Sequence, residues 1–409
     1  MNGGRRRRRF LIAAMLVDTL GGGLLAPFEL VYAIRVAHLP LTSAGVVLSL
    51  AAGAGIAIGP VAGATVDRLG PIRVVAVANG LGVAGCVSLL LWTSGWGYAM
   101  GAFLLGANLR VFWAAFTPLV ASIARAEELE GWFGRLRGAR YIGIVSGEGL
   151  SGVVFLAGVH TGLRLLVIVN GLSFVGALVL VLAAAPHGAS TGDHSEPEKP
   201  RRGYREVFKD RVNVALAALN IAATLLLVAP ILVLPVFVLD RLHLPTWLPG
   251  VLAAVLTATA ALGLLFGARL VRGRRRLRNL EFAAGLWAAG CAVLLLASLG
   301  AALAYGALFL AAILLGLGEA VYAPTADALP AALAPLGLRG RYAAVHQMAW
   351  GVSEAIAPSL GAATLAAGTM VLWLTLGGIA AGSAIAYRAL EKPTGSRDGI
   401  AGAEPTLPR

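Results

Sequence analysis

The chain has 409 residues, of which 58% are hydrophobic and 13% are charged, and 53 residues are glycine. This composition excludes an ordinary water-soluble domain, in which about a quarter of the residues are charged. Long unbroken apolar runs also disfavour a β-barrel, whose strands alternate over about ten residues. The chain is therefore expected to be an all-α integral membrane protein, a class in which glycine is common because small residues let helices approach closely.

Apolar stretches fill almost the whole chain, and each is close to the ~20 residues that cross a hydrocarbon core of ~30 Å as a helix. We predict twelve transmembrane helices in two pseudo-symmetric six-helix bundles. The predicted spans are residues 10–36, 43–65, 73–94, 97–123, 139–159, 163–185, 212–238, 247–268, 280–299, 302–326, 341–366 and 368–388.

A polar stretch rich in Pro, Ser and mixed charge divides these spans six and six. The predicted parts are an N-terminal bundle (1–185), a cytoplasmic linker (186–211), a C-terminal bundle (212–391) and a disordered cytoplasmic tail (392–409). The halves match at an offset of about 205–210 residues, which places Cys86 and Cys291 in equivalent spans. Parallel repeats of this kind predict a substrate site at the interface between halves and alternating access by rocking.

The net charge of +13 follows a topological pattern. Of the 33 Lys and Arg residues, 29 fall in segments that become cytoplasmic if the N-terminus is cytoplasmic, Arg110 lies inside a span, and only Arg35, Arg164 and Arg241 fall on the outer side. This positive-inside bias predicts a multi-pass protein of the cell (inner) membrane with both termini cytoplasmic. The basic excess suits anionic membrane lipid, and we expect no nucleic-acid partner because the chain lacks a soluble basic face.

A short motif follows the second predicted span. It has the pattern Gly-x-x-x-Asp-Arg-x-Gly-x-x-Arg, formed by Gly63, Asp67, Arg68, Gly70 and Arg73. From the residues alone, Gly63 is expected to permit close packing, Asp67 to pair with a helix N-terminus or an Arg, and Gly70 to turn the chain. The motif resembles the cytoplasmic loop signature of the major facilitator superfamily, which implies a latch that closes the cytoplasmic side. A plain topological signal with a solvated ion pair is the alternative.

Two further segments resemble those of proton-coupled members of this superfamily. Arg110 in the fourth span is similar to their buried Arg. Residues 143–152 resemble the antiporter motif Gly-x-x-x-Gly-Pro-x-x-Gly-Gly, with Glu148 in place of Pro and Ser151 in place of a Gly. The resemblance implies a twelve-helix transporter of the drug:proton antiporter group. The segments 318–324, 339–342 and 350–351 also resemble drug-efflux members.

Six ionisable side chains fall well inside predicted spans, and each would cost ~2.5–3.5 kcal/mol if it faced lipid. They must therefore face water, pair with one another or be neutral. We predict that they form the proton and substrate pathway: Asp18, Glu29, Arg110, Glu148, Glu319 and Glu354. Asp327 and His346 lie nearer the cytoplasmic ends of their spans.

Our leading hypothesis pairs Asp18 or Glu148 with Arg110 as a proton-responsive switch, because burial favours a neutral carboxyl group and a nearby Arg favours an ionised one. A static buried ion pair is the alternative. In a continuous helix Asp18 and Glu29 would share one face, about three turns apart. Glu319 and Glu354 favour cationic substrates or protons, unless they are protonated hydrogen-bonding groups. Glu29 is either a vestibule residue or one without a direct role.

No phosphate-binding loop, nucleophile arrangement or His/Cys cluster at metal spacing is present in the sequence. We therefore expect no enzyme activity and no cofactor or metal, with transport driven by an ion gradient, most simply protons. The predicted function is proton-coupled efflux of small lipophilic or cationic compounds by a monomer whose partners are this small-molecule substrate and membrane lipid. The alternatives are a proton-coupled importer of a small metabolite and, less favoured, a membrane enzyme or a receptor without flux.

Overall fold

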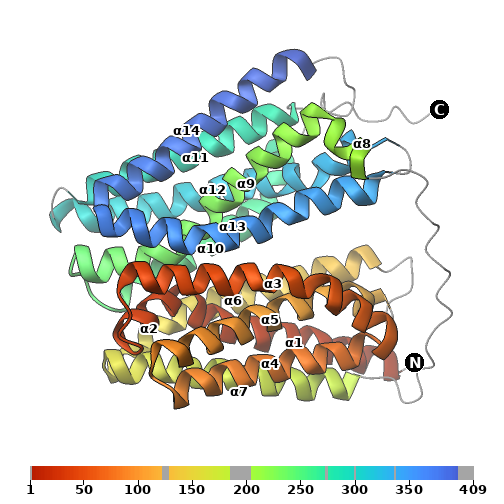
Figure 1. Ribbon diagram of the computed structural model, residues 1–409, viewed down its shortest axis with the longest axis vertical. Helices are drawn as coiled ribbons and strands as arrows, with labels where there is room; N and C mark the ends of the chain where they lie inside the picture. The colour runs from red at the N-terminus through yellow and green to blue at the C-terminus, as the bar shows by residue number, and fades with distance from the viewer. Residues whose placement is uncertain are drawn as a thin grey trace. The chain divides into compact units, whose positions relative to one another are not determined.

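The computed structural model describes residues 2–121, 129–184, 204–271, 275–298, 301–335 and 338–394, and the regular structure in these ranges is helical (Figure 1). The first half contains α1 (Asn2–Leu25), η1 (Ala26–Phe28), α2 (Glu29–Arg35), α3 (Leu41–Leu69), α4 (Pro71–Leu91), α5 (Gly95–Ala121), α6 (Leu129–Val154), η3 (Phe155–Ala157) and α7 (Val159–Ala184). The second half contains α8 (Tyr204–Lys209), α9 (Arg211–Val236), η4 (Phe237–Arg241), α10 (Leu248–Val271), α11 (Arg276–Ala297), α12 (Ala301–Leu333), α13 (Arg339–Ala367) and α14 (Thr369–Thr394).

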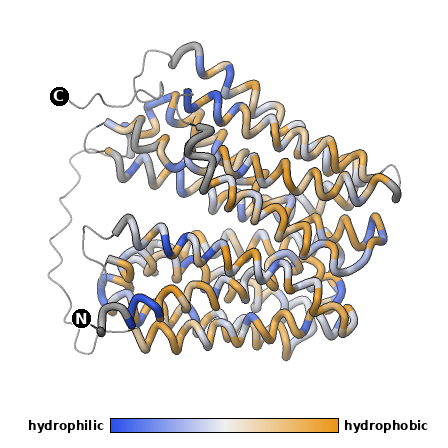
Figure 2. The backbone as a smooth tube through the Cα atoms, turned by 180° about the vertical axis from the view of Figure 1, so that it is seen from behind, coloured by the Kyte–Doolittle hydropathy of each residue, from blue (hydrophilic) through white to orange (hydrophobic). Residues whose placement is uncertain are grey.

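The composition of these helices is that of a multi-pass membrane protein. Within the described ranges nine helices are long and apolar enough to cross a membrane, and Leu248–Leu264 is a shorter apolar helix. Every predicted span overlaps a helix, but α6 and α13 are not among those nine, so the count of twelve spans stays a prediction. Figure 2 shows apolar residues along most of each described helix. Large apolar side chains such as Leu50 and Leu91 are 68% exposed, as expected for surfaces that face lipid.

The first predicted span is not one continuous helix. It divides into α1, the 3₁₀ helix η1 and α2, with Pro27 inside the break. Proline lacks a backbone N–H and its ring clashes with the preceding turn, which weakens an α-helix at this position, although α5 and α13 continue through Pro118 and Pro358. Glu29 begins the helix after this break, and the expectation that Asp18 and Glu29 share one face stays a prediction.

Part of the predicted linker is ordered. Residues 204–209 form α8, and Asp210 caps the start of α9 by accepting hydrogen bonds from the backbone N–H groups of Val212 (3.1 Å) and Asn213 (3.4 Å). The Tyr342 hydroxyl donates to the second oxygen of Asp210 at 3.1 Å. The remainder of the predicted linker, and the predicted tail from residue 395 onward, lie outside the described residues.

The chain forms two compact units. Unit 1 comprises residues 1–196, 231–254 and 358–363, and unit 2 comprises 197–230, 255–357 and 364–409. Unit 1 thus contains the helices of the first half together with η4 and parts of α9, α10 and α13. The division into bundles at the linker stays a prediction.

Equivalent glycine contacts recur in the two units. In unit 1 a Cβ atom added at Gly171 of α7 would lie 3.2 Å from Cys86 Cβ of α4, and in unit 2 one added at Gly377 of α14 would lie 3.3 Å from Cys291 Cβ of α11. These pairs are related by the offset found in the sequence. Small residues therefore bring the corresponding helices of each unit close together, as expected where association depends on close packing.

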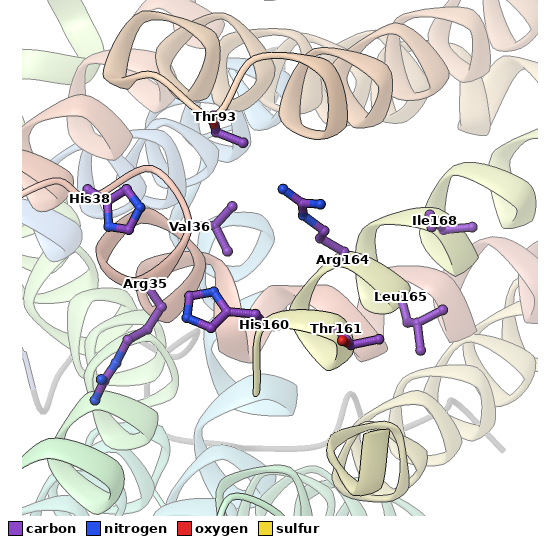
Figure 3. Close-up of a pocket in the computed structure, with 9 residues that line it drawn as sticks. All are labelled: Arg35, Val36, His38, Thr93, His160, Thr161, Arg164, Leu165 and Ile168. Carbon is purple, nitrogen blue, oxygen red and sulfur yellow. The ribbon is translucent and has the colours of Figure 1, made fainter. Parts of the chain in front are cut away.

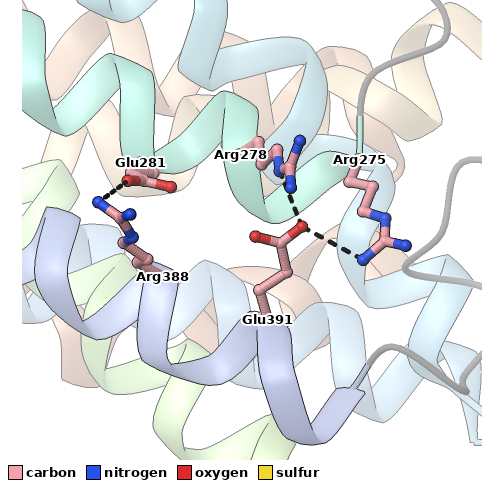
Figure 4. A network of polar contacts seen from close by, with 5 residues as sticks. All are labelled: Arg275, Arg278, Glu281, Arg388 and Glu391. Carbon is pink, nitrogen blue, oxygen red and sulfur yellow. Dashed lines mark hydrogen bonds and ion pairs between the residues drawn. The ribbon is translucent and has the colours of Figure 1, made fainter.

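An ion-pair network joins the start of α11 to the end of α14 in unit 2 (Figure 4). Glu391 accepts from Arg278 Nε at 2.9 Å and from Arg275 at 3.4 Å, and Arg388 lies 3.9 Å from Glu281. The arginine side chains are 53–78% exposed. Pairs this exposed contribute only about 0–1 kcal/mol each, so packing rather than charge must hold these helices together.

Helices α1 and α6 touch through their backbones. A Cβ atom added at Gly143 of α6 would lie 2.7 Å from Leu16 O of α1, and one added at Gly147 would lie 2.8 Å from Leu24 N. From the other side, a Cβ atom at Gly23 would lie 2.5 Å from Ile144 O. Any side chain at these positions would push the two helices apart.

We predict that Gly147→Ala destabilises the protein by about 1–3 kcal/mol, because overpacking against backbone atoms outweighs the better helix propensity of Ala. Gly149→Ala is the matched control on the same helix, since its Cβ would meet only Ala254 Cβ at 3.8 Å. Thermal unfolding of the purified proteins in detergent measures the difference. Equal midpoints for the two variants would contradict the close contact.

Candidate functional site

Asp18 borders a small cavity inside unit 1. The cavity has a volume of about 20 Å³, which is enough for about one water molecule. Asn79 of α4 borders it too; this residue is only 1% exposed, its Nδ2 donates to Val75 O at 2.9 Å, and its Oδ1 has no hydrogen-bond partner in the described structure. The remaining lining is apolar and is formed by Leu11, Ala14, Met15, Phe112, Phe116, Leu119, Val120, Leu136, Ala177 and Val181.

A buried acceptor without a partner costs about 1–3 kcal/mol, and one water in the cavity would remove this cost by donating to Asn79 Oδ1. The same water would then lie in a cavity that Asp18 also borders. The arrangement can therefore hydrate a carboxyl group within a membrane-spanning helix.

Arg140 is the cation whose charge acts on Asp18. Its guanidinium carbon lies 5.2 Å from the centroid of the Trp113 ring on α5, a cation–π distance. Arg140 precedes Gly143 and Gly147 by three and seven residues, so it lies on the face of α6 that packs on α1. Arg140 has the position of a cytoplasmic loop charge in the sequence, but its helical register with the two glycines is the signal that places it beside Asp18.

Arg110 and Glu148 lie in different surroundings. The Arg110 side chain on α5 packs on α3, where a Cβ atom added at Gly55 would lie 3.3 Å from Arg110 Cγ. Glu148 is 3% exposed on α6, and its backbone carbonyl accepts from Ser151 Oγ at 2.6 Å. The pairing of Arg110 with Asp18 or Glu148 stays a prediction.

The antiporter-like segment 143–152 serves as a packing surface along its length. Its first glycines contact α1, as described above, and its end contacts residues next to and within α10. A Cβ atom at Gly152 would lie 2.9 Å from Trp247 O, and one at Gly250 would lie 2.6 Å from Glu148 O. Helix contacts on two sides therefore account for the small residues of this segment.

Glu29 lies directly after the break in the first span and is half-buried. Its charge acts on Tyr98 and on Cys86. The Tyr98 hydroxyl donates to Glu29 O at 3.1 Å, and the Tyr32 hydroxyl donates to Leu89 O at 2.6 Å. These bonds join the broken span to α4 and α5 and hold the carboxyl-bearing turn in place.

The acids of unit 2 lie on two helices that also carry a polar network. Glu319 of α12 and Glu354 of α13 are half-buried, whereas Asp327 of α12 is exposed. Around them α9, α12 and α13 are joined by hydrogen bonds. These run from the Tyr322 hydroxyl to Asn220 Oδ1, from Asn220 Nδ2 to His346 O (3.0 Å), between the Thr224 and Ser353 hydroxyls (2.6 Å), and from Ser353 Oγ to Ile221 O (2.8 Å).

The predicted gating loop agrees with the structure at Gly70 but not at Gly63. Gly70 connects α3 to α4 with φ 80° and ψ 155°, a conformation that essentially only glycine adopts. Asp67, Arg68 and Arg73 are exposed, and no ion pair of Asp67 is found in the described ranges. No atom lies within 4 Å of a Cβ atom added at Gly63, so the expected close packing at Gly63 is wrong for this structure.

Segments from both halves of the sequence meet within unit 1. Arg35 of α2 forms an ion pair with Asp240 of η4. The backbone N–H of Ser359 on α13 donates to Ser49 Oγ on α3 at 3.0 Å. A Cβ atom added at Gly45 would lie 2.5 Å from Ala362 Cβ. In this conformation α3 and α13 are therefore in backbone contact at these positions.

No group of three His, Cys, Asp or Glu side chains among the described residues is arranged to hold a metal ion. The expectation that the protein needs no cofactor stays a prediction.

The sequence and the fold both resemble those of known proteins. The family described as "Major Facilitator Superfamily" matches residues 10–310. No curated protein matches the chain by sequence.

Solved structures of similar fold include several transporters. A variant of the nucleoside transporter NupG superposes with a TM-score of 0.78 at 14% identity, over 94% of this chain and 99% of that one. The peptide transporter POT in complex with sulfate gives 0.77 at 13% identity, over 97% and 96%. An inward-facing, unoccupied bacterial homologue of the human lysosomal transporter Spinster gives 0.66 at 13% identity, over 98% and 97%. At such identities these likenesses show the fold alone.

We predict that Gly70→Ala destabilises the folded protein by about 1–3 kcal/mol, because a side chain is strained at this φ and ψ. Gly63→Ala is the control in the same motif and is expected to be neutral or slightly stabilising, since its Cβ meets open space and Ala favours a helix. Denaturation midpoints of the purified variants check both. A Gly70→Ala protein as stable as Gly63→Ala would contradict the stated role of Gly70.

Proposed function

Because the chain belongs to the Major Facilitator Superfamily, whose pattern covers residues 10–310, we propose that it is a secondary active transporter of the drug:proton antiporter group. It exports small lipophilic or cationic compounds by alternating access, driven by protons. One observation carries this proposal: the carboxyl group of Asp18 lies inside a membrane-spanning helix. It borders a water-sized cavity and lies under the charge of Arg140.

Asp18 combines the features that a proton-carrying group needs. Burial favours the neutral carboxyl form and a nearby cation favours the ionised form, so a small change in the position of Arg140 can change the protonation state. The cavity that Asp18 and Asn79 border has room for one water molecule, which can carry the proton. Arg140 lies on α6 and Asp18 on α1, so a shift between these helices would couple proton binding to conformation.

The charges of unit 2 support a cationic substrate. No Lys or Arg occurs between Arg278 and Arg339 or between Arg341 and Arg388. The helices in these ranges contain the acids Glu319, Asp327 and Glu354. Acidic groups that must be accommodated within a membrane favour protons or cationic compounds over anions.

The proposed transport machinery consists of six pathway residues and a cytoplasmic gating loop. Asp18, Glu29, Arg110, Glu148, Glu319 and Glu354 form the proton and substrate pathway. Gly63, Asp67, Arg68, Gly70 and Arg73 form the cytoplasmic gating loop. The protein is placed in the cell membrane with both termini in the cytoplasm, as its 29 Lys and Arg residues on that predicted side favour.

A second candidate is proton-coupled import of a small polar metabolite. The similar structures include a nucleoside transporter and peptide transporters, one of them in complex with 5-aminolevulinic acid.

Purified protein in proteoliposomes with an imposed pH gradient distinguishes the two candidates. The lipophilic cation ethidium, a nucleoside mixture and a dipeptide mixture serve as probes. The export proposal expects ethidium to move against the direction of proton flow. Movement of a nucleoside or dipeptide together with protons, without ethidium flux, would replace it by the import candidate.

We predict that Asp18→Asn and Arg140→Gln each reduce proton-driven flux of the transported probe at least tenfold, because one removes the proton-binding group and the other the cation that tunes it. Arg137→Gln is the matched control, since Arg137 is an exposed Arg on the same helix three residues earlier. Wild-type flux in both Asp18→Asn and Arg140→Gln would contradict the proposal that Asp18 and Arg140 form a proton-responsive switch.

We also predict that a disulfide between Ser49→Cys and Ser359→Cys, whose native residues are joined by a hydrogen bond of 3.0 Å, abolishes transport, because alternating access requires contacts between the two sequence halves to break in every cycle. The background protein carries Cys86→Ser and Cys291→Ser, and each single-Cys variant is a control. Oxidation is expected to stop flux in the double variant alone, and reductant to restore it. Full flux of a completely cross-linked protein would contradict alternating access at this contact.

A further inference from the structure

A second, much larger pocket lies in unit 1, away from Asp18. It has a volume of about 580 Å³ and lies where the end of α2, the α4–α5 connection and the start of α7 meet (Figure 3). The lining is formed by Arg35, Val36, His38, Thr93, His160, Thr161, Arg164, Leu165 and Ile168.

The polar lining consists of arginine, histidine and threonine side chains, and no carboxylate is among the described residues that line the pocket. Arg35 is engaged by Asp240, and Figure 3 shows its guanidinium directed away from the other basic groups. Arg164 extends into the space toward His38 and Thr93, with His160 below it in the same view. Arg164, His38 and His160 therefore remain to receive a ligand, and all three are exposed.

This concentration of positive charge departs from the rest of the predicted outer side. Only Arg35, Arg164 and Arg241 among 33 Lys and Arg residues fall on that side, and two of these three line the pocket. Two of the six histidines of the chain join them. The positive-inside rule explains why outer cations are scarce, but it does not explain why they gather.

The backbone adds to the same preference. His160 and Thr161 lie in the first turn of α7, whose free N–H groups and helix dipole favour an anion. His38 has a φ of 54°, a left-handed conformation uncommon for a residue other than glycine, and Leu39 N donates to Ala33 O at 3.0 Å to close this turn. His243, which lies outside the pocket at the repeat-related position, has a φ of 52°, and Leu244 N donates to Val238 O at 3.0 Å, so this turn is a structural element of the repeat that here directs His38 toward the pocket.

One part of the lining is apolar. Leu165 and Ile168 follow Arg164 along α7, and Ile168 is 40% exposed. An anion that carries an apolar group can therefore place its charge near Arg164 and its apolar part against these side chains.

We propose that this pocket binds a phosphate group, whose oxygens accept charge-assisted hydrogen bonds from Arg164, His38 and His160 and from the N-terminus of α7. The phosphate is carried by a lipid headgroup or is a free ion. This site is independent of the export proposal, since it contains none of the proposed pathway residues.

The test measures the thermal unfolding midpoint of the purified full chain in neutral detergent, because a ligand that binds only the folded protein raises it by mass action. One arm adds inorganic phosphate, with chloride at equal ionic strength as its control. The other arm adds dioctanoyl phosphatidylglycerol, with dioctanoylglycerol as its control. Arg164→Gln is compared with Arg241→Gln, which removes one positive charge from the same predicted side outside the pocket.

We expect at least one phosphate-bearing probe to raise the midpoint, and Arg164→Gln to weaken its apparent affinity about tenfold or more while Arg241→Gln does not. A response to the lipid alone assigns the phosphate to a headgroup, and a response to inorganic phosphate alone assigns it to a free ion. His160→Gln, an exposed position, gives the second variant if Arg164→Gln folds poorly, with an expected loss of at least about threefold. No response to either probe, or equal losses in the pocket variants and Arg241→Gln, would overturn the proposal.

Discussion

The close backbone contact between α1 and α6 is the constraint on which the candidate site depends. In a bilayer, apolar side chains do not drive helices together as they do in water, so van der Waals packing at small residues must do so. Gly23 on α1 and Gly143 and Gly147 on α6 allow that approach. The same register carries Arg140 toward Asp18, so that a charge costly in lipid gains an opposite charge and a place for water. Packing and chemistry are thus set by one helix face.

The two units share their packing but differ in their polar chemistry. Gly171 on Cys86 and Gly377 on Cys291 are the same kind of contact at repeat-related positions. In unit 1 the carboxyl group of Asp18 borders a small cavity and lies under the charge of Arg140. In unit 2, helices α9, α12 and α13 are joined by neutral hydrogen bonds such as that between Tyr322 and Asn220, beside acids on helices that lack Lys and Arg in their central parts. Such a division suits a protein in which one half binds the proton and the other contributes to binding a cationic substrate.

Sequence reasoning located the helices well, because a run of about 20 apolar residues has few alternatives in a membrane protein. It also identified Gly70, whose positive φ the structure confirms. It missed the break at Pro27, although proline gives a direct signal, because averaged hydropathy does not change there. It missed Arg140, because an Arg near a span end is taken as a topological charge unless its register with Gly143 and Gly147 is considered. At Gly63 the error is the opposite one: the motif predicts close packing, and the structure shows none.

The central claim is that the Asp18 carboxyl group takes up and releases a proton within the membrane-spanning part of the protein. Infrared difference spectroscopy of the purified protein in lipid, recorded while the pH is changed, observes protonated carboxyl groups directly. The account predicts a carboxyl band that changes with pH in the wild-type protein, disappears in Asp18→Asn and shifts its titration in Arg140→Gln but not in Arg137→Gln. An identical titration in wild type and Asp18→Asn would contradict it.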